Sequence, residues 1–184
     1  MERKEVIVSE QELARQKEFT RAMREMNDQR TRTPLALVDT FGCQQNVADG
    51  EVLMGMLREM GYELTRDENQ ADVILLNTCA IREHAEKRVY GHLGRLSHTK
   101  AAKPDQIICL CGCMAQQKVV ADKVKNSYHH VDLVLGPQAE WRLPELLHEV
   151  YTKNKRVFSI ENEHGRIAED LPIVREGGVR AWVS

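Results

Sequence analysis

Cysteine is the residue type in this chain best suited to chemistry, and the cysteines are spaced unevenly along the sequence. Cys43, Cys79 and Cys113 each follow a short apolar segment, and Cys109 and Cys111 lie within the last of those segments. The total of five is odd and the polar N-terminus holds no apolar export signal, so a disulfide framework is not expected and the chain is predicted to be cytoplasmic. In a reducing compartment a thiol serves as a small buried residue, a nucleophile or a metal ligand.

The spacing of the cysteines leaves several chemistries open. Three thiolates on separate loops suit a 4Fe–4S cluster in which one iron stays open to chemistry. The alternating Cys109, Cys111 and Cys113 suit zinc less well, because the familiar zinc-finger spacings are absent. No arginine follows a cysteine by six residues, as a phosphatase-type nucleophile would need, and the glycine-rich motifs of nucleotide-binding proteins are absent too. All five cysteines could also be inert buried residues.

The elements that must position these cysteines alternate between strand and helix. This alternation predicts an α/β fold with an open, doubly wound parallel sheet, Rossmann- or flavodoxin-like, and right-handed crossovers. Because the loops after parallel strands open on one edge of a sheet, Cys43, Cys79 and Cys113 are expected to meet there. Each loop leads into a helix N-terminus, whose positive dipole end favours thiolates. Strands are predicted at 35–41, 71–77, 105–111, 131–135 and 156–160, and helices at 46–60 (N-cap Asn46), 81–97, 115–125 and 137–151.

Composition divides the chain into three parts. Residues 1–34 are polar and are predicted to form a surface helix or a partly ordered arm, 35–160 form the α/β domain, and 161–184 begin as a polar linker. The sequence stops within a predicted strand that follows Gly177 and Gly178, which indicates that the natural protein continues. The net charge of −2 excludes a small basic nucleic-acid module, and no apolar run reaches the roughly 18 residues of a membrane span.

One local stretch departs from the overall charge. Residues 82–103 hold six basic and two acidic residues, which predicts either a solvated helix face or a face that contacts RNA phosphates. Three histidines in and around this stretch are expected to be surface residues, and both tryptophans are expected to be packing residues. These are His84, His92 and His98, and Trp141 and Trp182.

Three blocks around the loop cysteines resemble the signatures of the methylthiotransferase family. They read TFGCQQN at 40–46, NTCAIRE at 77–83 and GCMAQ at 112–116. The second block has the form of the family branch that modifies N6-dimethylallyladenosine in tRNA. The resemblance extends over about 35–184, and one departure is Gly50, where the family usually has serine.

The resemblance implies a fold, a cofactor and a reaction. Members of this family join an N-terminal α/β domain to a radical S-adenosylmethionine barrel and an RNA-binding barrel. The resemblance places an auxiliary 4Fe–4S cluster on Cys43, Cys79 and Cys113, while the barrel's C-x3-C-x2-C motif for a second cluster is missing here. The residues at 161–184 would therefore be a linker and the first strand of the barrel.

The complete enzyme would use S-adenosylmethionine to convert N6-dimethylallyladenosine-37, in the anticodon arm of tRNA, to its 2-methylthio derivative. Its sulfur donor is not indicated by the sequence. The chain by itself is not expected to be catalytically competent, because nothing in it would position S-adenosylmethionine for cleavage. The alternative is a free-standing, non-catalytic iron–sulfur or zinc-binding module.

Overall fold

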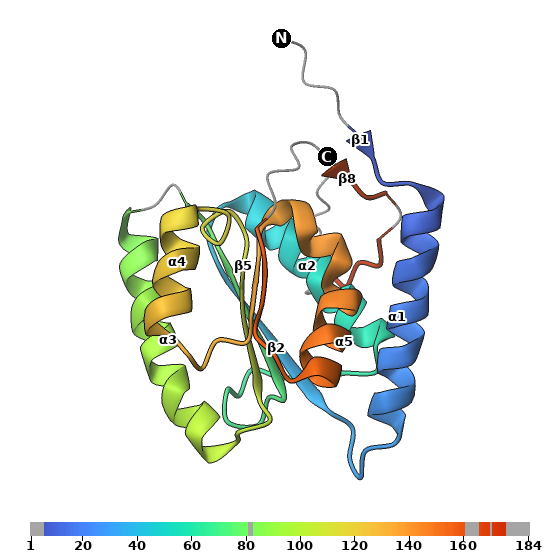
Figure 1. The fold of residues 1–184 in the computed structure, drawn as a ribbon, viewed down its shortest axis with the longest axis horizontal. Helices are drawn as coiled ribbons and strands as arrows, with labels where there is room; N and C mark the ends of the chain where they lie inside the picture. The colour runs from blue at the N-terminus through green and yellow to red at the C-terminus, as the bar shows by residue number, and fades with distance from the viewer. Residues whose placement is uncertain (1–5, 81–82, 161–165, 170, 176–184) are drawn as a thin grey trace.

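A computed structural model describes residues 6–80, 83–160, 166–169 and 171–175 of the chain. Its centre is a sheet of six strands in the order β3-β2-β4-β5-β6-β7, in which every neighbouring pair is parallel (Figure 1). The predicted α/β class and open parallel sheet are confirmed. The strands are β2 (Leu35–Phe41), β3 (Glu63–Leu64), β4 (Val73–Thr78), β5 (Ile107–Cys111), β6 (Leu133–Leu135) and β7 (Val157–Ser159).

The apolar sequence of β4 explains its central place in the sheet. All six of its residues are buried, as expected for a parallel strand covered on both faces. Successive side chains enter opposite layers: Val73 and Leu75 belong to one hydrophobic cluster, and Ile74 and Leu76 to the other.

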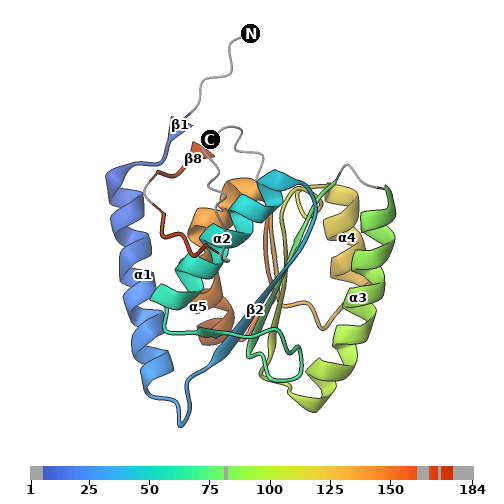
Figure 2. The ribbon, with the colours of Figure 1, turned by 180° about the vertical axis from the view of Figure 1, so that it is seen from behind.

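Helices cover both faces of the sheet. One layer holds α2 and α5, and the other holds α3 and α4 (Figures 1 and 2). The chain leaves β2 towards β3 on one side and then returns to β4 on the other, so the strand order reverses between β2 and β4. Ligand sites of open α/β sheets form at the carboxyl ends of strands next to such a reversal. The helices are α2 (Gln44–Glu59), α3 (Glu83–Ala102), α4 (Lys118–Ser127) and α5 (Leu143–Lys153), with the 3₁₀ helix η1 (Pro137–Arg142).

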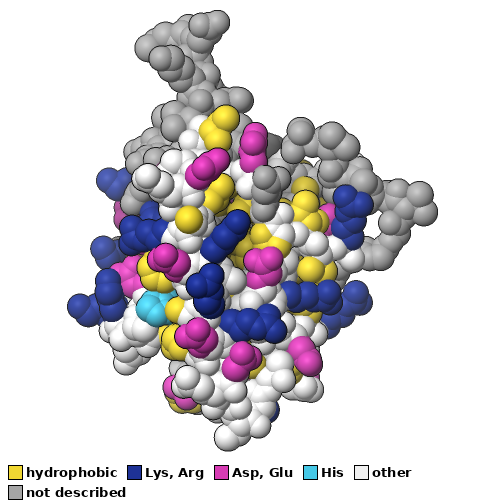
Figure 3. All heavy atoms as spheres, turned by 90° about the vertical axis from the view of Figure 1, so that its right-hand side faces the viewer, with side chains coloured by type: hydrophobic (Ala, Val, Ile, Leu, Met, Phe, Trp, Pro, Cys, Tyr) yellow, Lys and Arg dark blue, Asp and Glu magenta, His cyan; other side chains and the backbone are white. Residues whose placement is uncertain are grey.

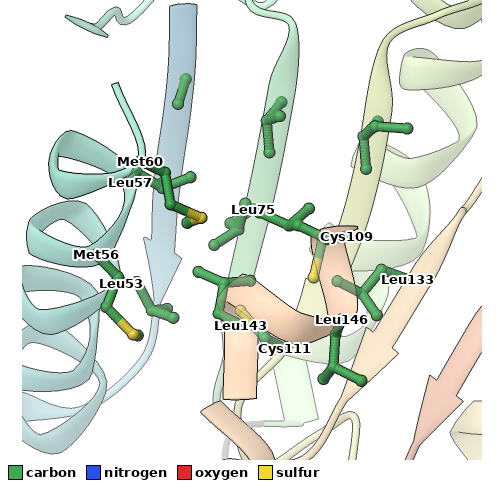
Figure 4. Close-up of a cluster of buried hydrophobic side chains, with 14 of the residues drawn as sticks. Leu53, Met56, Leu57, Met60, Leu75, Cys109, Cys111, Leu133, Leu143 and Leu146 are labelled. Atoms are coloured by element: carbon green, nitrogen blue, oxygen red, sulfur yellow. The ribbon is translucent and has the colours of Figure 1, made fainter. Parts of the chain in front are cut away.

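The crossover through α5 has an unusual hand. The strand order advances in one direction from β4 to β7, yet α5 lies on the opposite face from α3 and α4. This crossover therefore has the opposite hand to those through α3 and α4, and the expectation of uniform right-handedness is wrong for it. Packing supplies the reason, because Leu143 and Leu146 cover Cys109 and Leu133 on a part of the sheet that α2 does not reach (Figure 4).

The polar N-terminal region forms a helix that packs on this same layer. The helix α1 (Glu10–Asp28) begins with a capping box between Ser9 and Glu12. Met23 of α1 is fully buried in the cluster formed by α2 and α5. Of the two structures predicted for residues 1–34, the helix is the one observed. The outer face that carries α1 shows basic and acidic side chains side by side (Figure 3).

Several element boundaries differ from the prediction. The third helix runs to Ala102, five residues beyond the predicted end, and stops before Pro104, which disfavours helical backbone in the preceding residue. The helix after Cys113 begins at Lys118, because the residues between them form turns. Two short strands, β1 (Val6–Ile7) and β8 (Arg166–Ile167), pair in parallel within regions predicted as an arm and a linker. The strand predicted near the C-terminus lies outside the described residues.

Within the described residues, none of the helices combines the length and the apolar character needed to cross a membrane.

The burial of Met23 predicts that α1 is part of the cooperative core. We expect Met23→Ala to lower the free energy of unfolding by about 2–4 kcal/mol, because it leaves a cavity beneath α1. Arg21→Ala, at an exposed position on the same helix, should change it by less than about 0.5 kcal/mol. Urea unfolding followed by circular dichroism measures both values. A loss for Met23→Ala as small as that of the control would make α1 an appended arm.

Candidate metal centre

The structure brings the three loop cysteines to one edge of the sheet. Cys43 lies two residues beyond the end of β2, Cys79 directly follows β4, and Cys113 lies two residues beyond β5. The strand ends are in register, since Phe41 pairs with Thr78 and the Cys79 amide donates to the Phe41 carbonyl at 2.9 Å. The cysteines therefore lie at the carboxyl edge, beside the point where the strand order reverses.

Cys43 itself is the N-cap of α2, so the helix begins two residues before the predicted start at Asn46. The Asn46 side chain turns back to the cap: its Oδ1 atom accepts hydrogen bonds from the Cys43 amide and the Cys43 thiol, both at 3.3 Å. This arrangement resembles a capping box, in which the third helical residue satisfies the amide of the cap. Asn46 therefore orients the first cysteine of the site.

A buried asparagine pair fixes Asn46 in turn. Asn46 and Asn77 are 1% and 0% exposed. The side-chain amide of Asn46 donates to the Asn77 Oδ1 at 3.0 Å. The side-chain amide of Asn77 donates in turn to the backbone carbonyl of Asn46 at 2.8 Å. Because Asn77 precedes Cys79 by two residues on β4, this pair couples the loop of Cys43 to the loop of Cys79.

The third loop closes on the same asparagine. Gly112 has a φ of +88°, and a Cβ atom there would lie 2.5 Å from the Asn77 Oδ1. The sequence predicted a turn at Gly112 directly before Cys113, and this backbone conformation confirms it. Asn77 thus contacts or adjoins all three cysteine loops, which no spacing in the sequence reveals.

The electrostatic environment differs between the cysteines. The Asn46 backbone amide at the start of α2 lowers the pKa of Cys43, and a hydrogen bond from Cys79 acts in the same direction. Burial raises the pKa of Cys113, and the negative charge that Cys79 carries when ionised adds to this effect. The predicted helix dipole is thus absent at Cys113, since the helix that follows begins only at Lys118.

The sequence analysis did not assign two acidic side chains near Cys113, Glu140 and Asp49, to the site. Glu140 of η1 is 9% exposed; its carboxylate accepts a hydrogen bond from the Gly112 amide, and its Oε1 atom has no partner among the described residues. Burial and the charge of Asp49 raise the pKa of Glu140 well above its ordinary value. This shift favours the neutral acid, which limits the negative charge beside Cys113. A glutamate after a predicted strand gives no signal of such burial.

Cys109 and Cys111 belong to the core. Both are fully buried in the layer of α2 and α5 (Figure 4). A hydrogen bond with Cys109 and burial raise the pKa of Cys111 well above its ordinary value. The zinc interpretation of Cys109, Cys111 and Cys113 is not supported, because no three His, Cys, Asp or Glu side chains among the described residues are grouped to hold a metal ion.

The same finding applies to the three loop cysteines. They share one edge, but in the described structure their thiols do not surround a single point as the ligands of one ion do. Cys43 and Cys79 are joined by a hydrogen bond, and both raise the pKa of Cys113 through their charges. The three thiols are therefore neighbours without forming a compact mononuclear site.

His92 contradicts the prediction that it is a surface residue. It is 3% exposed, with its Nε2 atom 2.6 Å from the Glu68 Oε1 and its Nδ1 atom 3.6 Å from the Asp39 Oδ2. Both acids line a cleft of about 640 Å³ beside β2. His98 is exposed and Trp141 is buried, as predicted, whereas Trp182 and the His84 side chain lie outside the described residues.

The basic stretch is less available to RNA than its composition suggests. Lys100 of α3 forms an ion pair with Asp132 at 2.9 Å, and Lys103, just after α3, forms one with Asp72 at 2.8 Å. Arg88 is exposed on α3 and remains a candidate for phosphate contact.

An open parallel sheet with cysteine loops at its reversal point defines an α/β domain with a thiol-rich candidate site. The model of the "Uncharacterized protein family UPF0004" matches residues 36–136, the range that holds all three loops, and the chain belongs to this family.

The chain is also similar to curated proteins named tRNA-2-methylthio-N(6)-dimethylallyladenosine synthase. It is 43% identical over 187 residues to the protein of Acetivibrio thermocellus, covering 100% of this chain and 39% of that protein. It is 47% identical over 148 residues to the protein of Staphylococcus saprophyticus, covering 80% of this chain and 29% of that protein. The chain thus spans well under half the length of these relatives.

The asparagine pair generates a prediction about stability. Asn77→Ala removes the partners of two buried polar groups on Asn46, and we expect it to lower the free energy of unfolding by roughly 2–4 kcal/mol. Asn69→Ala, at an exposed position where the side chain donates to the neighbouring Asp67, should cost less than about 0.5 kcal/mol. Equal losses in urea unfolding would show that the pair does not hold the loops.

Proposed function

We propose that this chain is the domain of a tRNA methylthiotransferase that binds an auxiliary 4Fe–4S cluster through Cys43, Cys79 and Cys113. The observation that carries the proposal is the meeting of these three thiols at one sheet edge, next to the reversal of strand order. The similarity to tRNA-2-methylthio-N(6)-dimethylallyladenosine synthases supports the same reaction class.

The chemistry of the donor set fits an iron–sulfur cluster. Thiolates are the usual ligands of iron–sulfur clusters, and each thiolate of a 4Fe–4S cluster binds a different iron. Cys43, Cys79 and Cys113 supply three such thiols from three separate loops at one edge of the sheet. Three ligands leave one iron open, and when bound the cluster would supply that iron as a site for a sulfur ligand.

Three residues around the proposed cluster would each have a different role. The backbone amide of Asn46 favours the thiolate of Cys43. Gly112 lets the backbone pass close to Asn77 directly before Cys113. Glu140, held by the Gly112 amide, presents its unpartnered Oε1 atom as a hydrogen-bonding group next to Cys113.

The activity of the whole protein is also part of the proposal. A protein as long as the relatives would carry, beyond this domain, the radical S-adenosylmethionine cluster and would methylthiolate N6-dimethylallyladenosine-37 of tRNA in the cytoplasm. Within that enzyme, the residues described here bind and orient the sulfur-carrying cluster.

Metal analysis tests the ligand assignment. After anaerobic reconstitution with iron and sulfide, we expect about four irons per chain and broad absorption near about 400 nm from thiolate–iron charge transfer. Cys43→Ala, Cys79→Ala and Cys113→Ala should each lose most of the iron. The matched control Cys109→Ala should keep it and cost about 1 kcal/mol or less in packing. Zinc as the sole bound metal, without labile sulfide, would refute the assignment.

RNA binding tests the tRNA-facing side of the proposal. If α3 contacts phosphates, tRNA binding should weaken with salt, and a double change of Arg88 and Arg95 to Glu should weaken it further. The Arg95 side chain is 68% exposed and only loosely paired, 3.9 Å from Glu68. The control, a double change of Lys17 and Arg21 to Glu, changes the charge equally at exposed sites on α1. Filter binding at several salt concentrations compares them; identical affinities for the variants would favour a merely solvated helix face.

A further inference from the structure

The strand β2 has a neighbouring strand along only part of one side. On the side of β4, residues 36–41 all pair with residues 73–78. On the other side β3 is two residues long, and its pairing with β2 stops at Ala36 and Leu64. Figure 2 shows β2 as the nearest strand, with its upper part uncovered. The second half of β2 is therefore an open edge inside a sheet that is otherwise closed on that side by β3.

The backbone groups that face this open edge follow from the alternation along the strand. The Ala36 carbonyl accepts an amide from the loop after β3 at 2.9 Å, whereas the Phe41 carbonyl accepts an amide from the loop after β4 at 2.9 Å. The amides and carbonyls of Val38 and Thr40 consequently face the side that β3 leaves open. The Thr40 amide donates to the Asp39 carboxylate. For the backbone of Val38, the described residues supply no partner on that side.

The open edge forms one side of a cleft of about 640 Å³, and the two walls of the cleft differ in chemistry. The wall on the side of α2 presents the apolar side chains of Val47 and Leu64. The wall on the side of α3 presents the carboxylates of Asp39 and Glu68. His92 of α3 fixes both acids, because its ring nitrogens lie 2.6 Å from the Glu68 Oε1 and 3.6 Å from the Asp39 Oδ2.

The charge of the cleft selects the kind of partner that fits it. The described lining residues include three acids, Asp39, Glu51 and Glu68, and one base, Arg66. This lining repels the phosphates of a nucleic acid and attracts cationic groups. An exposed strand edge adds an extended segment through its main-chain groups, and alternate side chains of that segment point to opposite sides. One set would meet the apolar wall and the other set the carboxylates.

We propose that the open edge of β2 binds an extended, basic peptide segment of another protein as an added strand. The main chain of Val38 and Thr40 supplies the pairing groups. The α2 wall contacts the apolar side chains of the segment, and Asp39 and Glu68 pair with the basic ones. From 37 to 41 the edge measures about 13 Å, at about 3.3 Å per residue. Since Thr40 lies three residues before Cys43, the bound segment lies beside the cysteine edge.

Three comparisons of peptides separate pairing from charge. The probe is a fluorescent hexapeptide of alternating lysine and valine, and fluorescence anisotropy on the metal-free, reduced chain measures its Kd. A matched peptide with glutamate in place of lysine should not bind. Two further peptides carry N-methyl groups on either the lysine or the valine amides, so each has one edge without donors. One of these two should bind at least about tenfold more weakly than the probe.

Each other result of these comparisons would overturn the proposal. Equal affinities of the probe and both N-methyl peptides would mean that charge attraction alone binds the peptide. Absence of probe binding would mean that the carboxylates only protect the edge from pairing. Dimerisation of the chain alone, at the concentrations used, would make a second copy the occupant of the edge.

Variants of the chain test the residues of the cleft. Val38→Pro removes the amide at the open edge, a change that edge strands tolerate, and should weaken probe binding about tenfold. Asp39→Asn combined with Glu68→Gln should weaken it about fivefold and reduce its salt dependence. The control, Glu59→Gln combined with Asp105→Asn, removes two exposed acids that do not line the cleft and should leave the Kd unchanged. An equal loss in the control would assign the binding to net charge.

Hydrogen exchange locates the peptide on the unaltered chain, so it remains informative if Val38→Pro unfolds. Saturating probe should slow exchange of the Val38 amide at least about tenfold. The amides of Leu37 and Asp39, which face β4, should exchange as before. Protection at other sites, with Val38 unchanged, would overturn the proposal. Because no metal is present, none of these results depends on whether the three loop cysteines bind a cluster.

Discussion

The candidate site depends on the burial of two amide side chains at the reversal of strand order. Asn46 and Asn77 are cut off from water, where an unsatisfied amide is costly, and they satisfy one another through side-chain and backbone groups. That requirement joins the first turn of α2 to the end of β4, and Gly112 brings the end of β5 against the same pair. Three loops from separate parts of the chain are thereby fixed around one small polar centre.

The charges around this centre are unequal on its two sides. On the side of Cys43, helix amides supply hydrogen bonds that favour thiolate. On the side of Cys113, burial and nearby anions oppose ionisation, and Glu140 is pushed towards its neutral form. A ligand set of three thiolates concentrates negative charge, so a buried neutral acid is more compatible with it than a carboxylate. The asymmetry predicts ligands that differ in the pH at which they ionise.

Strand and helix alternation in the sequence was sufficient to predict five of the six strands and the position of the three loop cysteines at one sheet edge. It missed β3, the two-residue edge strand that makes the strand order reverse beside β2. It failed where tertiary contact decides. The start of α2 at Cys43 depends on Asn46 folding back, and the burial of His92 depends on carboxylates from Asp39 and Glu68. Glu140 looked like an ordinary helix residue. Short pairings such as β1 with β8 have too few residues to leave a pattern.

The sequence also does not distinguish a helical glycine that contacts another segment from one that faces open space. Gly55, Gly91 and Gly94 all occupy helix interiors, where glycine weakens the helix by comparable amounts. From the sequence they are equivalent. In the structure, only Gly55 receives another part of the chain, while the other two face open space. A Cβ atom on Gly55 would lie 2.2 Å from the carbonyl oxygen of Pro172, so the close approach of this segment to α2 requires glycine. The composition-based boundary after residue 160 therefore marks a change in residue type but does not mark the end of ordered packing on the domain.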